Sequence, residues 1–218
     1  MIVVTDREAG VLHATSGRLA ASAVASAVAI ASGLVASGGD VPGWEAEIFH
    51  TVNDLPDAIR PVMWVFQLAG LLLVPLLVAL VALARHRVRL AAGLVVLVPL
   101  KLVAEKAVVK QLVERDRPGT SICELDTTCG NFRDVPLEGL SFVSGHAVIA
   151  WGVVALLWPY LSTGWRWIAT LIAALNAVAR VYLGAHNPLD VVGGAAIGVV
   201  LGVVLTMMLG AAGRRAPA

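Results

Sequence analysis

Charged residues are scarce in this 218-residue sequence: Asp, Glu, Lys and Arg make up 14% of it, whereas a soluble domain carries about 25%. No run of Lys and Arg is long enough to form a nucleic-acid-binding patch, and the formal net charge is only +1. The sequence therefore argues against a nucleic-acid-binding protein. The charges cluster and leave long apolar runs, which predict an integral membrane protein that forms a single domain over residues 1–218.

Residues that bind metals are also sparse. The two cysteines, Cys123 and Cys129, lie in one polar loop, and no histidine accompanies them at the spacing of zinc ligands. The sequence shows no cluster of carboxylates of the kind that binds a hard cation. We therefore expect neither a metal site nor a cofactor.

Six apolar stretches dominate what is present. They predict an all-α fold, a six-transmembrane-helix bundle, with spans over residues 17–37, 61–84, 90–109, 143–161, 168–182 and 188–209. The first stretch is only mildly apolar, so a cleaved signal peptide is an alternative to a retained helix. Its apolar run exceeds a usual signal core, which favours a retained helix.

Three further patterns lie within or between these stretches. Lys101 and Glu105 are four residues apart in the third span, which predicts an ion pair, with a direct catalytic role as the alternative. Glycines spaced four apart on one face of the sixth span predict a close helix contact there: Gly194, Gly198 and Gly202. Apolar residues at helical spacing within residues 17–60 predict a short amphipathic helix on the membrane surface, after the first span: Trp44, Ile48, Phe49, Val52 and Leu55.

The distribution of basic residues predicts the topology. Lys and Arg in short loops mark the cytoplasmic side, and they occur here at residues 85–89, at Arg166 and at residues 214–215. Six spans with the N-terminus inside place all three on that side. The polar ends of helices 3 to 6 then meet at the extracytoplasmic face, where we expect the active site of a multi-pass protein of the cell (inner or plasma) membrane.

This topology bears on the two cysteines. Cys123 and Cys129 fall in the loop expected outside the cell membrane, where disulfides persist. We therefore predict that they are joined and pin the loop that follows Arg117. Two free loop thiols are the alternative.

The first polar motif is Lys110 and Arg117, seven residues apart. If the helix of the third span continues, seven residues make about two turns and both cations share one face. An arginine fork and a lysine charge suit a phosphate group. The alternative is a pair of charged side chains that reach for the interface from a helix end.

The second motif is Ser144-Gly145-His146 at the start of the fourth span. Serine is a good N-cap, and a helix N-terminus presents unpaired backbone N–H groups to an anion. Glycine lets a ligand approach the backbone closely. The alternative is a capping serine followed by a buried, hydrogen-bonded histidine.

The third motif joins the fifth and sixth spans. Arg180 is a third cation, and His186 is followed by Asn187-Pro188, which predicts a helix cap and first turn. Asp190 lies four residues after His186, so its carboxylate can accept from one imidazole nitrogen and leave the other free to attack. The alternative is an Arg180–Asp190 ion pair beside an uninvolved histidine.

Taken together, these motifs resemble the three-part signature of the type-2 phosphatidic acid phosphatase superfamily. The resemblance covers about residues 90–209, with the motifs in the right order and on the right helices. Two positions depart from the pattern: Val143 stands where proline is usual, and Ala179 stands where serine is usual. Neither departure removes a residue with a nucleophilic or proton-transfer role.

The resemblance implies a role for each site residue. His186 is implied to attack phosphorus and form a phosphohistidine, with Asp190 holding its tautomer. His146 is implied to protonate the leaving oxygen and then to activate water. The phosphoryl oxygens are implied to be held by the three cations and one backbone segment: Lys110, Arg117, Arg180, Ser144 and Gly145.

The expected function is hydrolysis of a membrane lipid phosphate or diphosphate, without a metal. A polyprenyl diphosphate, phosphatidylglycerophosphate and phosphatidic acid all fit, and family analogy favours a polyprenyl substrate. A lipid phosphotransferase on the same site is one alternative, and a non-catalytic protein that binds a lipid head group is another. The retained histidines and Asp190 argue against the second, because binding alone requires only the cations. The oligomeric state stays open.

Overall fold

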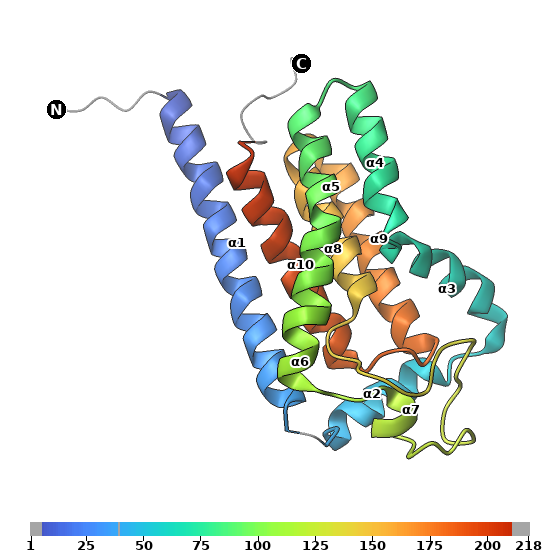
Figure 1. Cartoon of the computed structure of the whole chain (residues 1–218). Helices are drawn as coiled ribbons and strands as arrows, with labels where there is room; N and C mark the ends of the chain where they lie inside the picture. The colour runs from blue at the N-terminus through green and yellow to red at the C-terminus, as the bar shows by residue number, and fades with distance from the viewer. Residues whose placement is uncertain (1–5, 39, 211–218) are drawn as a thin grey trace.

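The computed structural model describes residues 6–38 and 40–210, with side chains from residue 15 onward (Figure 1). These residues form helices and loops and no β-strand. The longer helices are α1 (Asp6–Ala36), α2 (Gly43–Asn53), α3 (Arg60–Gln67), α4 (Leu73–Ala84), α5 (Val88–Leu102), α8 (Gly145–Leu157), α9 (Thr163–Tyr182) and α10 (Pro188–Met208). Shorter turns are η1 (Asp57–Ile59), η2 (Leu68–Gly70), η3 (Val103–Val109), α6 (Lys110–Val113), α7 (Pro118–Ser121) and η4 (Trp158–Tyr160).

The outer surface of this bundle is apolar. Large hydrophobic side chains are exposed along α1, α4 and α9, among them Val24, Ile30, Leu34, Leu77, Leu80 and Leu171. Within the described residues, two helices are long and apolar enough to cross a membrane, Thr15–Ala36 and Pro188–Met208, and a bent pair adds a third if it counts as one span. Helix 145–160 is apolar but shorter. The chain is thus an all-helical membrane protein, and the count of six spans stays a prediction.

Helix α10 is the centre of the bundle, packed between α1 and α8 (Figure 1). The predicted glycine face makes this possible. A methyl group on Gly198 would lie 2.5 Å from the Val148 carbonyl oxygen, and one on Gly202 would lie 2.6 Å from the Cβ atom of Ala155. Only glycine permits this approach, so the predicted close contact is confirmed.

The second apolar stretch is not one straight helix, contrary to the prediction. Segments 57–70 and 73–84 meet at an angle of 63°. The bend brings η2 against α8, where a methyl group on Gly70 would lie 2.5 Å from the Cβ atom of His146. Asn176 of α9 donates to the carbonyls of Phe66 and Gln67, which a straight helix would have used internally. The bend therefore places backbone next to His146.

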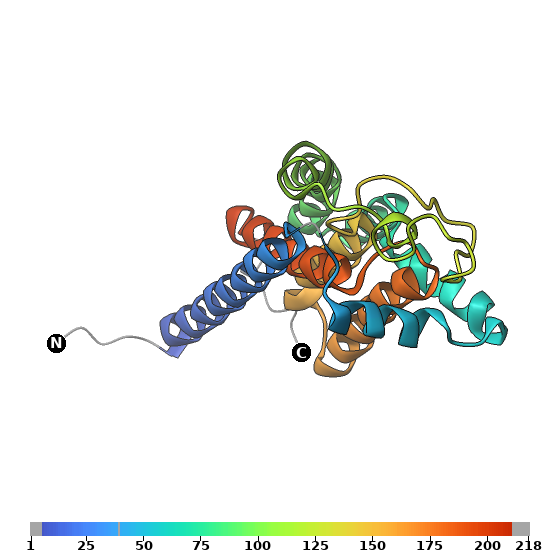
Figure 2. The same ribbon diagram turned by 90° about the horizontal axis from the view of Figure 1, so that it is seen from below.

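Helix α2 forms where the amphipathic pattern predicts, and its large apolar residues divide between two sides: Trp44 and Ile48 are exposed, whereas Phe49 is buried. It packs against α9 and α10 at the lower end of the bundle (Figure 2). Phe49 is fully buried in a cluster with Ala147, Val181 and Val191. One side of α2 therefore packs on the bundle as part of the wall around the polar end, and contact of its other side with the membrane surface stays a prediction.

The long loop after α6 covers the same end (Figures 1 and 2). The structure joins Cys123 and Cys129 by a disulfide within it. Backbone hydrogen bonds link Arg117 N to Gly139 O and Ser141 N to Arg115 O, at 3.1 and 2.6 Å. The two arms of the loop are therefore paired in extended conformation just before α8 begins.

Candidate active site

The first motif does not continue as a helix, so the expected shared helix face is wrong. Helix α6 ends at Val113, and Glu114 adopts a left-handed conformation with φ of 48°. Residues 115–117 then run extended, so Arg115 and Arg117 point to the same side of the chain. Arg117 Nη1 donates to the carbonyl of Ala185 at 2.8 Å. Arg117 reaches the α9–α10 connection through strand-like geometry.

Lys110 is held by an acidic partner. Its Nζ lies 3.0 Å from Glu105 Oε1, and Lys101 pairs with the same carboxylate. The predicted pairing of Lys101 and Glu105 is confirmed, and Lys110 makes it a triad. A side chain at Gly145 would collide with both Lys101 and Glu105. The triad therefore lies directly beside the start of α8.

The second motif opens α8, as predicted, but the serine hydroxyl does not cap the helix. Ser144 occupies the N-cap position without a side-chain capping bond, and its buried Oγ has no protein partner. Its backbone N–H instead donates to the Asp190 carbonyl at 2.9 Å. His146 is half-buried one residue into the helix. It lies within electrostatic range of His186, Arg180 and Arg117.

Arg180 lies in the last turn of α9, beside the bend in the second apolar stretch. The residue is 8% exposed, and its Nη1 donates to Gln67 Oε1 at 2.6 Å. Its Nε is buried without a protein partner. Gln67 was not identified from the sequence, because a glutamine in an apolar helix carries no motif.

The third motif folds as predicted around Asn187 and Pro188. Asn187 is the N-cap of α10, Pro188 is its first residue, and Asp190 lies in the first turn. Nδ1 of His186 lies 3.5 Å from Oδ2 of Asp190, a close contact longer than a hydrogen bond. The same oxygen accepts from the Asn187 N–H at 2.8 Å and from the Ser141 hydroxyl. The carboxylate is thereby fixed beside the imidazole.

His186 is only 3% exposed in the connection between α9 and α10. Burial, together with the positive charges of Arg180 and Arg117, lowers the pKa of His186 well below its usual range. The imidazole is therefore neutral near pH 7, which is the form that has a free lone pair.

Asp190 also contacts residues that the motifs do not include. Arg115 Nη1 lies 3.4 Å from Asp190 Oδ1, and the guanidinium forms a two-pronged pair with Glu45 at 3.0 and 2.6 Å. Glu45 Oε1 accepts from the Leu189 N–H at 2.8 Å. The side chains of Arg115, Glu45 and Asp190 are fully buried. Glu45 lies 70 residues from Arg115, and no local pattern could have linked them.

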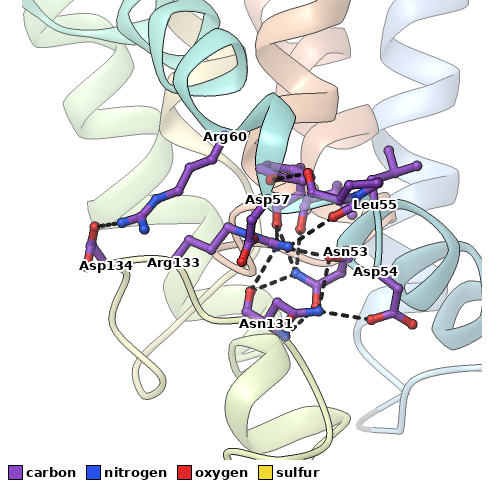
Figure 3. A network of polar contacts seen from close by, with 11 residues as sticks. Asn53, Asp54, Leu55, Asp57, Arg60, Asn131, Arg133 and Asp134 are labelled. Carbon is purple, nitrogen blue, oxygen red and sulfur yellow. Dashed lines mark hydrogen bonds and ion pairs between the residues drawn. The ribbon is translucent and has the colours of Figure 1, made fainter.

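A second polar network holds the covering loop and the end of α9 (Figure 3). Buried Arg133 donates to the carbonyls of Asn53, Leu55 and Tyr182, and its guanidinium lies 4.0 Å from the Tyr182 ring centre. The Asn53 amide donates to the carbonyls of Asn131 and Tyr182 at 2.9 and 3.0 Å. These contacts satisfy the carbonyls at the C-terminus of α9. They fix the helix end that precedes His186.

This arrangement can be compared with known proteins. The model of the PAP2 superfamily matches residues 88–214, more than half of the chain. The chain belongs to the PAP2 superfamily. This confirms the resemblance that the three motifs indicated, and the match spans every motif residue.

Three individual proteins are similar to this PAP2 protein. An undecaprenyl-diphosphatase from Sulfolobus acidocaldarius is 45% identical over 60 residues, which are 27% of this chain and 28% of that protein. The crystal structure of Aquifex aeolicus LpxE superposes with a TM-score of 0.54 at 26% identity, covering 74% of this chain and 93% of that one. The crystal structure of a transmembrane PAP2-type phosphatidylglycerolphosphate phosphatase from Bacillus subtilis superposes with a TM-score of 0.46 at 22% identity, covering 88% of this chain and 91% of that one.

Proposed function

We propose that this PAP2 protein is a membrane phosphatase that hydrolyses a lipid phosphate or diphosphate through a phosphohistidine intermediate. The observation that carries the proposal is the convergence of two histidines and three cations at one end of the bundle. Arg117 donates at 2.8 Å to the carbonyl of Ala185, the residue before His186. The Glu105 carboxylate that pairs with Lys110 lies against Gly145, the residue before His146. The charge of Arg180 acts on both histidines. The buried carboxylate of Asp190 lies 3.5 Å from Nδ1 of His186.

The first half-reaction uses the neutral imidazole of His186. With Nδ1 turned toward Asp190, Nε2 is the nitrogen left to attack phosphorus. A P–N bond forms, the P–O bond to the leaving group breaks, and His146 donates a proton to the departing oxygen. Asp190 stabilises the positive charge that develops on the attacking ring.

The second half-reaction returns the enzyme to its starting state. Neutral His146 accepts a proton from water, the water oxygen attacks phosphorus, and the P–N bond breaks to release inorganic phosphate. Arg117 and Arg180 stabilise the charge on the phosphoryl oxygens in both steps. Lys110 joins them once substrate draws it from Glu105. The buried, unpartnered Ser144 hydroxyl and Arg180 Nε are donors that a phosphoryl group would satisfy.

The substrate that we favour is a polyprenyl diphosphate. The support is the 60-residue segment shared at 45% identity with the Sulfolobus undecaprenyl-diphosphatase. The apolar outer surface of the bundle suits a substrate whose long chain stays in the bilayer while its head group reaches the polar end. Phosphatidylglycerophosphate and phosphatidic acid are the comparison substrates.

We also propose that residues 1–218 form one membrane domain with six spans and the site at the extracytoplasmic face. The basic turn at residues 85–89 lies at the opposite end of the bundle from α2 and α7 (Figure 1), which supports this orientation. A reporter fused within residues 119–139 should read as extracytoplasmic, and one within residues 85–89 as cytoplasmic. A cytoplasmic signal from residues 119–139 would overturn the orientation.

The activity is tested by phosphate release from purified protein in mixed micelles. The panel is undecaprenyl diphosphate, undecaprenyl phosphate, phosphatidylglycerophosphate and phosphatidic acid, with His186→Ala as the inactive control. Release from undecaprenyl diphosphate at the highest kcat/KM is the expected result. No release from any lipid by folded protein would contradict the phosphatase. If an alcohol is added and the phosphoryl group is transferred to it in preference to water, the protein is a phosphotransferase.

A further inference from the structure

The buried ion pair between Glu45 and Arg115 lies immediately behind Asp190. Both side chains have no exposed area, and the pair is two-pronged, at 3.0 and 2.6 Å. Burying such a pair costs desolvation free energy that the pairing often does not repay. Fold stability alone is therefore a poor reason for placing it there.

The pair is attached to the segment that carries Asp190. Glu45 accepts from the Leu189 N–H at 2.8 Å, one residue before Asp190. Arg115 lies 3.4 Å from the Asp190 carboxylate on the oxygen that does not face His186. Glu45 belongs to α2 and Arg115 to the extended segment after α6. The pair therefore connects both of these segments to the first turn of α10.

Arg115 lies closer to the carboxylate of Glu45 than to that of Asp190. Glu45 takes the two short contacts, and Asp190 receives only the 3.4 Å contact. Without Arg115, two buried carboxylates would face each other and one would take up a proton. Without Glu45, the guanidinium would pair fully with Asp190 and draw the carboxylate away from the imidazole.

We propose that Glu45 and Arg115 are positioning residues of the reaction. Together they hold the Asp190 carboxylate ionised and directed at His186. This inference rests on the proposed phosphatase activity. It adds that α2, which lies outside the residues matched by the family model, is required for the rate of the chemical step and not for substrate binding.

The test is Glu45→Gln, which keeps the side chain's size and an acceptor for Leu189 but removes the charge. The expected result is a fall in kcat, and in the rate of phosphoenzyme formation, of about 10- to 100-fold, the range for removal of a partner that orients a metal-bound histidine. KM should stay within about twofold of the wild-type value, because binding groups are untouched. The matched control is Glu47→Gln on the exposed side of the same helix, which should match the wild type.

A second variant covers the case in which Glu45→Gln does not fold. Glu45→Leu with Arg115→Met removes both buried charges together, a change that often leaves stability unaffected. A folded double variant with lowered kcat and unchanged KM supports the proposal. A folded variant with wild-type kcat, or with only KM raised, overturns it while the phosphatase stands. A wild-type protein that releases no phosphate overturns the proposed function and this inference with it.

Discussion

Replacing Asp190 with asparagine exchanges one carboxylate oxygen for an NH2 group and removes the negative charge. In the structure, Oδ2 faces His186 Nδ1 at 3.5 Å and accepts from the Asn187 N–H at 2.8 Å and from the Ser141 hydroxyl. Oδ1 faces Arg115 at 3.4 Å. An amide has a single acceptor oxygen, so its NH2 group must face either Arg115 or the donors on the other side. At least one buried donor then loses its acceptor, at a cost of about 1–3 kcal/mol of folding free energy for each.

The effect on chemistry should be larger. Loss of the carboxylate leaves the imidazole free to adopt the wrong tautomer, and in an analogous Asp–His pair this lowers kcat by about 10⁴. That corresponds to about 5 kcal/mol of transition-state stabilisation. We expect Asp190→Asn to fold, with a lower thermal midpoint, and to lose up to that factor in kcat.

The assay is phosphate release alongside thermal unfolding in the same detergent. Asp40→Asn is the control, because Asp40 is exposed in the connection before α2. A folded Asp190→Asn protein with a kcat within about threefold of the wild type would show that Asp190 does not hold the tautomer of His186, since loss of that function lowers kcat by orders of magnitude.

Three further predictions concern the surroundings of the site. Arg133→Leu should lower the free energy of unfolding by about 2–4 kcal/mol, because several buried carbonyls lose their donor. Arg60→Leu, at an exposed ion pair, should lower it by less than about 1 kcal/mol. Equal thermal unfolding midpoints for the two variants would contradict this. Cys123 and Cys129 should be joined in protein from an oxidising compartment, and two free thiols by non-reducing mass spectrometry would count against it. Burial lowers the pKa of His186, so as the pH falls the unfolded chain takes up a proton on this histidine before the folded protein does. The free energy of unfolding should therefore fall between about pH 7 and about pH 5, and it should fall less steeply in His186→Gln. If the two proteins lose stability equally over this range, His186 is not the group responsible.

The sequence predicted those features that depend on local pattern. Apolar runs identified the helices, and the four-residue spacing of Gly194, Gly198 and Gly202 predicted a close helix contact, which the structure makes with α8. Asn187 and Pro188 marked the start of α10, because capping and fixed proline geometry act within a few residues.

What the sequence did not predict depends on contacts across the fold. The bend before α4 lies between Gly70, which packs on His146, and Pro75, which is in the first turn of α4 and cannot donate to the carbonyl of Leu71. Pro75 is compatible with a new helix start, but only the packing on α8 sets the direction of the bend. The end of α6 at Glu114 turned the seven-residue spacing of the first motif into an extended segment. Glu45 became part of the site only through a partner 70 residues away. Contacts between side chains so far apart in the sequence leave no repeating pattern of residues from which they could be predicted.

Rapid-quench trapping can show directly whether His186 carries the phosphoryl group during turnover. Wild-type protein mixed with ³²P-labelled undecaprenyl diphosphate should give an acid-labile, base-stable phosphoenzyme that forms and decays within a turnover. His186→Ala should give none, while His146→Ala should accumulate it from a substrate with an activated leaving group, because its hydrolysis is slowed. A phosphoenzyme that persists in folded His186→Ala, or near-normal turnover by that variant, would show that another residue is the nucleophile.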